Sequence, residues 1–155
     1  MGKILLSFFD YTGNWSKPFR NDINWSVSTF DIKNGQDIMN FDPAKFMSEY
    51  LHGMQKYNIP EIGLLFAVPC TDYALSGAAW FAAKDNDGRT AQSQKLVQKT
   101  KEIIDWFEKT GCLKFYAIEN PMSRIHKLNP WMGSPLLKFN PCDFAGYDED
   151  PEKSR

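Results

Sequence analysis

Four short segments of the chain have the apolar patterns of β-strands. Residues 3–9 form an apolar run that ends in the turn-rich segment 10–14, and residues 61–67 form a second continuous run. Continuous runs are typical of strands that are covered on both faces, as in a parallel sheet. Residues 25–32 are rich in β-branched and aromatic side chains, and residues 113–118 are again apolar. We therefore predict four strands.

Two further segments have apolar residues at helical spacing. The first begins with Asp42 as an N-cap and Pro43 at the first helical position, and its apolar positions recur until Asn58. In the second, the apolar positions of residues 96–107 share one face, and Gly111 supplies the C-cap. Strands that alternate with helices predict an α/β fold with a mostly parallel sheet, right-handed crossovers and helices on both faces.

The composition supports a folded domain without a general affinity for polyanions. The chain has 155 residues, of which 43% are hydrophobic and 15% aromatic, and this excludes intrinsic disorder. We expect one domain over residues 1–147, followed by a charged tail at 148–155. The 18 basic and 19 acidic residues give a net charge of -1. Any contact with nucleic acid must therefore be local.

Three cysteines and two histidines supply neither a disulfide framework nor a metal centre. Cys70, Cys112 and Cys142 are widely spaced, odd in number and without a Cys-x-x-Cys pair. The apolar start of the chain is too short for a signal peptide or a membrane span, and Asp10 follows it. We expect a cytoplasmic protein with no metal and no membrane contact, and the sequence leaves its oligomeric state open.

Polar residues follow each predicted strand, where parallel sheets bind their ligands. Residues 10–14 follow the first strand, Asp31 ends the second, residues 68–71 follow the third, and residues 119–121 follow the last. An acidic residue at the end of the second strand is the usual acceptor for ribose hydroxyls, and Gly13 lets the backbone approach a ligand. A solvated strand end and an ordinary turn are the alternatives at these two positions.

Two residues at the ends of the third and fourth predicted strands are candidate catalytic residues. Cys70 follows Pro69 at the end of a buried strand, which holds a nucleophile rigidly, although free cysteines also fill gaps in cores. We assign the other two cysteines to that packing role. Glu119 ends an apolar strand, where a carboxylate is costly to bury without a partner. A helix cap and an ion pair with Arg124 are the alternatives for Glu119.

These positions resemble motifs of the cytosine carbon-5 DNA methyltransferases. The segment 68–77 resembles the Pro-Cys nucleophile loop of that family, and residues 119–120 resemble its Glu-Asn dipeptide. Residues 9–14 resemble the cofactor loop Phe-x-Gly-x-Gly-Gly. Asp31 and the segment 35–38 fall where the family places its acidic residues for ribose and adenine.

The resemblance covers residues 3–145 and implies a Rossmann-like fold that binds S-adenosylmethionine as methyl donor. It places Asp31 on the ribose and Asp37 near the adenine amino group. The full set of residues that it assigns to the cofactor is Phe9, Asp10, Gly13, Asn14, Asp31 and Asp37.

The resemblance also implies a reaction with DNA as the partner. The Cys70 thiolate adds to carbon 6 of cytosine while Glu119 donates to ring nitrogen 3, and carbon 5 then takes the methyl group. Asn120 holds the loop of Pro69 and Cys70 in place. A target base in duplex DNA must first be flipped out of the helix.

The chain departs from the family pattern at several positions. Tyr11 and Asn14 stand where the family has glycines, and Val68 replaces the first proline of Pro-Pro-Cys. The sequence stops at Arg155, before the target-recognition region of the family, as expected for a truncated or a short phage-type or restriction-modification member. Two alternatives stay open, the same chemistry on RNA or a pyrimidine nucleotide and a catalytically silent binding domain.

Overall fold

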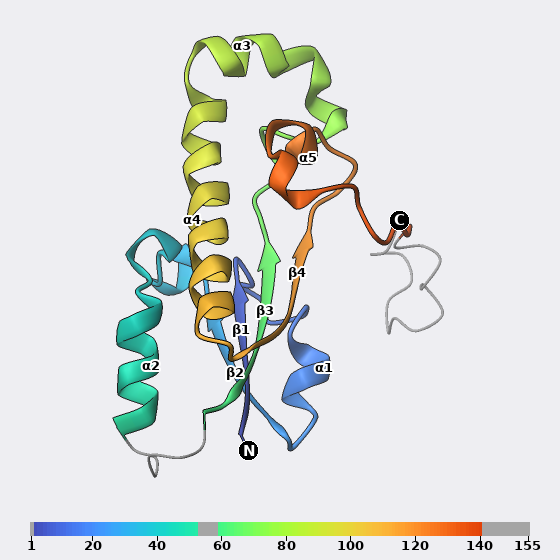
Figure 1. The fold of residues 1–155 in the computed structure, drawn as a ribbon. Helices are drawn as coiled ribbons and strands as arrows, with labels where there is room; N and C mark the ends of the chain where they lie inside the picture. Colours follow the sequence, from blue (N-terminus) through green and yellow to red (C-terminus); the bar gives the residue numbers. More distant parts are fainter. Residues whose placement is uncertain (1, 53–58, 141–155) are drawn as a thin grey trace. The chain divides into compact units, whose positions relative to one another are not determined.

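The computed structural model describes residues 2–52 and 59–140, which include one sheet of four parallel strands (Figure 1). The chain divides into two compact units, Met1–Ser123 and Arg124–Arg155, and the sheet belongs to the first. The predicted boundary at 147/148 and Cys142 lie outside the described residues.

The four strands lie where continuous or β-rich sequence predicts them. They are β1 (Lys3–Phe8), β2 (Trp25–Phe30), β3 (Glu61–Ala67) and β4 (Leu113–Glu119). Their order in the sheet is β2-β1-β3-β4, and every neighbouring pair is parallel. The α/β class and the parallel sheet are thereby confirmed.

Two strands end earlier than predicted, each for a local reason. β1 stops at Phe8 because Phe9 has a φ of 60°, which lies outside the β region of backbone conformation. β2 stops at Phe30 because the Asp31 carboxylate accepts the Lys33 N–H at 2.8 Å and begins a short 3-10 helix. A side chain that bonds to a nearby backbone N–H diverts the chain from the ladder.

The two predicted helices are present. α2 (Pro43–His52) begins as predicted, since the Asp42 carboxylate accepts the N–H groups of Ala44 and Lys45 at 2.9 and 3.1 Å. The continuation predicted as far as Asn58 lies outside the described residues.

α4 (Arg89–Lys109) is the longest helix and buries the predicted face. Its C-cap is Thr110, not Gly111 as predicted; Gly111 follows it with a φ of 72°. That left-handed residue is where a glycine is favoured just after a helix end.

Short helices appear where the sequence predicts loops. α1 (Lys17–Arg20) follows β1, and the 3-10 helix η3 (Leu75–Trp80) leads into α3 (Phe81–Asn86). None has a clear apolar stripe in sequence, so the helical period gives no signal there.

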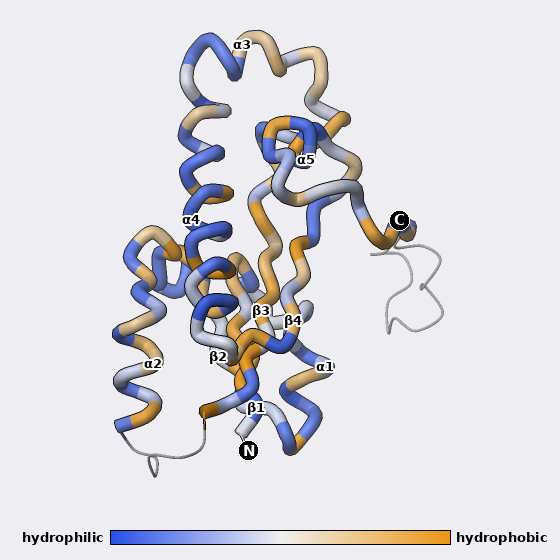
Figure 2. Tube along the Cα trace, viewed as in Figure 1, coloured by the Kyte–Doolittle hydropathy of each residue, from blue (hydrophilic) through white to orange (hydrophobic). Residues whose placement is uncertain are grey.

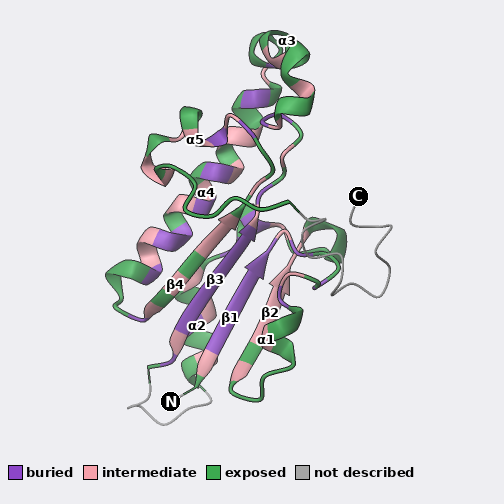
Figure 3. Cartoon of the chain, turned by 90° about the vertical axis from the view of Figure 1, so that its right-hand side faces the viewer, coloured by how far each residue is buried: buried purple, intermediate pink, exposed green. Residues whose placement is uncertain are grey.

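Helices cover the sheet on both faces, as predicted: α2 and α4 lie on one side, and α1 lies on the other (Figure 1). Under the first pair, the ring of Phe8 stacks on Phe30 and Phe66, both at 4.9 Å between centroids, and meets the edge of Phe41 at 5.0 Å. On the α1 side, Phe115 lies 5.9 Å from Phe19. The inner strands β1 and β3 are the most buried and apolar, while β2 and β4 form partly exposed edges (Figures 2 and 3).

The described part of the second unit has little regular structure, as the proline-rich sequence predicts. It contains α5 (Ile125–Leu128) and the 3-10 helix η4 (Pro130–Met132). Within residues 2–52 and 59–140, no helix has the length and apolarity needed to cross a membrane.

Candidate functional site at the carboxyl edge of the sheet

The loop after β1 is built around the carboxylate of Asp10. This buried side chain is 5% exposed. Its Oδ2 atom accepts Ser7 Oγ at 2.8 Å, Ser16 Oγ at 2.7 Å and the Ser16 N–H at 3.1 Å. Three donors on one oxygen tie the end of β1 to the start of α1, so Asp10 shapes the loop from within.

Two positive φ angles bend this loop across the strand end. Phe9 has a φ of 60° and donates its N–H to the carbonyl of Phe30 at 2.7 Å, which joins the ends of β1 and β2. Gly13 has a φ of 69°, and an added Cβ would lie 3.0 Å from Arg20 Nη2. Left-handed backbone at a non-glycine residue costs about 1–2 kcal/mol and clusters at ligand sites.

The loop after β2 positions two carboxylates, each through a hydrogen bond to a backbone N–H two residues further on. Asp31 caps the first 3-10 turn through its Oδ1 atom, and Asp37 caps a second turn (Ile38–Asn40) by accepting the Met39 N–H at 2.9 Å. Each described contact uses Oδ1. The Oδ2 atoms can therefore accept from ligand hydroxyl or amino groups.

A surface pocket of about 220 Å³ opens at this end of β2. Its lining combines two aromatic rings, a glycine and polar side chains, namely Phe30, Gly35, Gln36, Asp37, Asn40 and Phe41. Asp37 is thus at a pocket, whereas Asp31 does not line it. A flat ring between apolar walls with a carboxylate at the edge is what this lining can accommodate.

The loops after β3 and β4 are joined by a side chain. Asn120 Nδ2 donates to the carbonyl of Val68 at 2.9 Å, and Ala67 is the register partner of Glu119 in the parallel pair. This contact reaches the residue before Pro69, in the loop that the family resemblance expects Asn120 to hold. The contact joins residues 52 positions apart.

Backbone contacts extend the same junction. The Leu75 N–H donates to the carbonyl of Met122 at 2.9 Å, and Ala74 forms an antiparallel bridge with Ser123. The segment after Cys70 therefore runs along the segment after Glu119, within the first unit.

Cys70 sits on a tight turn between these anchors. Its carbonyl accepts the N–H groups of Tyr73 at 2.9 Å and Ala74 at 2.8 Å. Its thiol is free and half-buried, while Cys112 is buried and packs against Thr110. Partial exposure on a fixed turn suits a nucleophile, and the Cys112 site suits the packing role that the sequence predicts.

Glu119 lies at the tip of the edge strand β4. The residue is exposed overall, yet partial burial of its carboxyl raises its pKa above the ordinary 4.5. A carboxyl that binds its proton more tightly is the kind of group that acts as a general acid nearer to neutral pH.

Sequence reasoning missed a polar cluster behind the Cys70 turn. Lys84 Nζ lies 3.1 Å from Asp72 Oδ1, and Ser93 Oγ donates to Asp72 Oδ2 at 2.6 Å. Lys84 lies in a segment that reads as a polar loop, and its pairing depends on α3, which the sequence does not predict. The opposite charges of residues 72 and 84 are the one feature of the sequence that could have indicated this ion pair. Oppositely charged residues are usually solvated at the surface, so the feature is weak.

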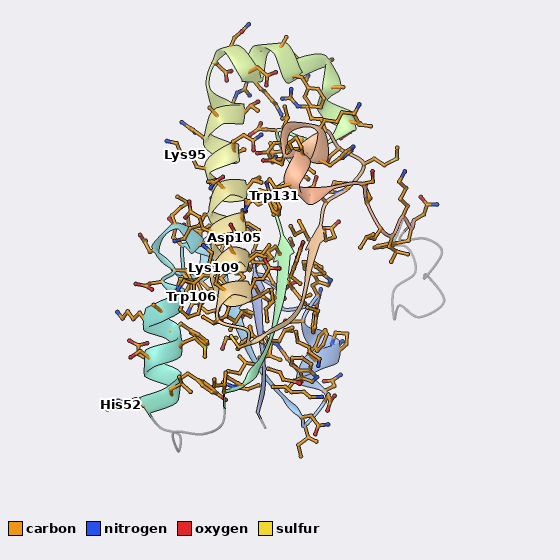
Figure 4. All side chains as sticks on the ribbon, in the orientation of Figure 1. His52, Lys95, Asp105, Trp106, Lys109 and Trp131 are labelled. Carbon is orange, nitrogen blue, oxygen red and sulfur yellow. The ribbon has the colours of Figure 1, made fainter. Side chains whose placement is uncertain are left out.

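The strand order brings the predicted residues into two neighbouring groups. Phe9, Asp10, Gly13 and Asn14 follow β1, beside Asp31 and Asp37 after β2, while Pro69, Cys70, Glu119 and Asn120 follow β3 and β4. Because β1 pairs with both β2 and β3, the two groups share one edge of the sheet. His52 lies at the far end of α2, away from that edge (Figure 4).

Within the described ranges, no three His, Cys, Asp or Glu side chains gather as a metal site would require. No protein-family model, curated protein or solved structure matches the chain.

Proposed function

We propose that the protein is an S-adenosylmethionine-dependent methyltransferase that acts on carbon 5 of cytosine in DNA. The observation that carries the proposal is the bond from Asn120 Nδ2 to the Val68 carbonyl. This bond joins a Pro-Cys turn to a Glu-Asn strand end at the carboxyl edge of adjacent parallel strands. A nucleophile and an acid fixed on neighbouring strand ends are the arrangement that addition to an aromatic base requires.

The residues at the ends of β1 and β2 fit the cofactor. The pocket of about 220 Å³ is smaller than the ~300–1,000 Å³ of sites that enclose a whole ligand, so it suits the adenine ring alone. Asp37 lines this pocket and would accept from the adenine amino group, and Asp31 would accept from ribose hydroxyls. Gly13 and Phe9 would bring the backbone of the loop after β1 against the rest of the cofactor.

The chain's own residues supply the covalent chemistry. Cys70 adds as a thiolate to carbon 6, and its sulfur supplies the electron pair of the new bond. Glu119 donates a proton to nitrogen 3 as charge develops on the ring. When bound, S-adenosylmethionine would supply the electrophilic methyl group that carbon 5 takes. Loss of the carbon 5 proton to solvent then lets the Cys70 sulfur leave as a thiolate, and the nitrogen 3 proton returns to Glu119, which restores the aromatic ring.

Cofactor binding is tested by calorimetric titration with S-adenosylhomocysteine. We expect Asp37→Ala and Asp31→Ala each to weaken binding at least about tenfold, a loss of about 1.4 kcal/mol. Asp22→Ala is the matched control, because Asp22 makes the same kind of backbone bond, to the Asn24 N–H at 2.9 Å, before β2. Absence of binding to the folded wild-type protein would overturn the cofactor assignment.

The covalent step is tested with DNA that contains 5-fluorocytosine. S-adenosylmethionine is included, and once carbon 5 has taken the methyl group its fluorine cannot leave as a proton does, so the adduct through sulfur persists and retards the protein on a denaturing gel. We expect an adduct with the wild type and with Cys112→Ser, and none with Cys70→Ser. An adduct that survives Cys70→Ser, or transfer of the methyl group without any adduct, would contradict the assigned role of Cys70.

The net charge of -1 favours one competing substrate class. A small pyrimidine nucleotide needs no extended basic surface, whereas DNA binding gains from phosphate contacts. Methyl transfer to a free nucleotide in preference to duplex DNA would support the proposed reaction at carbon 5 but would replace DNA by the nucleotide as the substrate. Cofactor binding without transfer to DNA, RNA or nucleotide would indicate a silent binding domain.

A further inference from the structure

Behind the Cys70 turn lies a buried charge cluster of three side chains. Asp72 and Lys84 are 11% and 10% exposed, and Lys84 Nζ lies 3.1 Å from Asp72 Oδ1. Ser93 Oγ donates to Asp72 Oδ2 at 2.6 Å. The three residues come from the turn, from α3 and from α4, so the cluster links both helices to the turn.

Lys84 also bonds to the turn itself. Its Nζ donates to the carbonyl of Thr71, the residue after Cys70. That bond fixes the peptide plane next to the nucleophile. On the other side of Cys70, Asn120 fixes the carbonyl of Val68. The turn is therefore held from both directions, by β4 on one side and by α3 on the other.

The cluster places two opposite charges within two residues of Cys70 on the turn, on Asp72 and on the Lys84 Nζ that bonds to Thr71. Together, Asp72 and Lys84 are neutral, so removal of either one leaves a net charge in a region with little solvent to screen it. Other charged groups on the elements beside the turn are Asp85 on α3, Asp87 and Arg89, which pair at 2.6 Å, and Glu119 at the end of β4. These groups are present in the wild type and in every variant at 72 or 84.

We propose that Asp72 and Lys84 act as positioning residues for Cys70, holding its turn in place and balancing the charge around its thiol. The inference rests on the proposed function only in taking Cys70 as the nucleophile. Ser93 supports the pair by fixing the second oxygen of Asp72.

The test is the pH profile of Cys70 alkylation by iodoacetamide, measured by peptide mass spectrometry with Cys112 as internal reference. Asp72→Asn leaves the Lys84 cation unbalanced and stabilises the thiolate. We expect the midpoint of Cys70 alkylation to move to lower pH by about half a unit or more. Lys84→Met removes the cation that lies 3.1 Å from the Asp72 carboxylate, and we expect a shift to higher pH.

Opposite shifts distinguish charge balance from simple loosening of the turn, which would move both variants in the same direction. We expect Lys84→Arg and the double variant Asp72→Asn/Lys84→Met to stay near the wild-type midpoint. Lys114→Met is the control, because it breaks the Lys114–Glu61 pair, 3.4 Å apart, at the opposite ends of β4 and β3 from the turn. Shifts in one direction, or none in either variant, would overturn the proposal.

A variant that does not fold leaves the proposal testable. Circular dichroism identifies such a variant. If Lys84→Met is unfolded, Asp72→Asn decides alone: a lower midpoint supports the proposal, and an unchanged or higher one overturns it. Alkylation requires neither DNA nor S-adenosylmethionine. Opposite shifts in a protein that transfers no methyl group would therefore refute the proposed reaction while leaving the charge balance established.

Discussion

Gly63 lies within β3, where the ring of Phe115 from β4 covers its backbone. An added Cβ would lie 2.6 Å from Phe115 Cζ and 3.0 Å from Leu5 Cδ1. Phe115 has little room to turn aside, because the rings of Phe19 and Trp25 each lie 5.9 Å from it. The missing side chain at 63 is what lets this aromatic cluster close over the face of the sheet beside α1.

We expect Gly63→Ala to lower the free energy of unfolding by about 1–3 kcal/mol, since a methyl group there overpacks the core. Urea denaturation measures the change. Gly77→Ala is the control, because its nearest atom, Lys84 Nζ, lies 3.9 Å from the added Cβ, and we expect a change within about 0.5 kcal/mol. Equal effects of the two substitutions would contradict the steric account.

Glu119 gives a pH dependence whose sign follows from its raised pKa. Burial raises the folded-state pKa above the ordinary 4.5, so the folded chain binds this proton more tightly than the unfolded chain. Between the pKa of Glu119 in the unfolded chain and its pKa in the folded chain, the free energy of unfolding falls as pH rises. Above the folded-state pKa, the full cost of a partly buried, charged carboxylate is present. We expect Glu119→Gln to be relatively more stable at about pH 8 than at about pH 4, compared with the wild type. A stability difference between the two proteins that is flat with pH would contradict the shift.

At the scale of elements, the loop after β1 depends on one carboxylate for its shape. Ser7 and Ser16 are fully buried, and Asp10 is their acceptor. The same oxygen orders the backbone at Ser16, at the start of α1. A loop held from within in this way keeps its strained residue Phe9 in place while the outer surface stays open to a ligand.

We expect Asp10→Ala to lower the free energy of unfolding by about 2–4 kcal/mol, because it leaves buried donors without an acceptor. We also expect it to weaken S-adenosylhomocysteine binding through the change in loop shape. Asp22→Ala removes an exposed acceptor and serves as the control, with a change below about 1 kcal/mol. If Asp10→Ala denatures in urea like the wild type, the internal role of this carboxylate is wrong.

Elements with a strong apolar pattern could be predicted from the sequence, and contacts between distant residues could not. The run at 61–67 predicts β3 because an inner parallel strand is apolar on both faces. The predicted end of β2 at residue 32 is wrong. The Asp31 carboxylate accepts the Lys33 N–H, and the strand ends at Phe30. Lys84 reads as a solvated loop residue, yet it is buried, because its partner Asp72 lies on a turn that only the tertiary fold brings near.

The candidate site divides in the same way. The order of strands and the rule that ligands bind at their carboxyl ends are enough to gather Cys70, Glu119 and Asn120 at one edge. The role of each side chain within the loops depends on tertiary contacts that the sequence does not show. Asp10 and Asp37 are both acidic residues in loops at that edge, yet one is the internal support of a loop and the other lines a pocket.

At the scale of the whole molecule, the balance of charge limits how the protein can hold a polyanion. The net charge is -1, and Arg89 and Lys101 are engaged in ion pairs on α4. If the proposed function holds, attraction to DNA therefore comes from a small number of local contacts.

We expect the affinity for a short duplex to fall with salt at a logarithmic slope shallower than about 4, because each phosphate contact contributes about 0.9. Fluorescence anisotropy across a salt series gives this slope. A free pyrimidine nucleotide is the comparison, with a slope near zero. A steep slope with duplex DNA would show an extended basic surface and contradict the local-contact account.

The strand order also sets how the chain assembles. β1 and β2 are neighbours in sequence, as are β3 and β4, but the central pairing joins Lys3 to Glu61 and Phe8 to Phe66. Each half can form around its own crossover, whereas the central pairing requires a much longer loop to close. We expect this closure to limit the rate of folding, so that Leu5→Ala slows refolding in stopped-flow fluorescence. Until the closure occurs, the inner edges of β1 and β3 present open backbone to other chains, which makes this interval the one in which aggregation competes with folding.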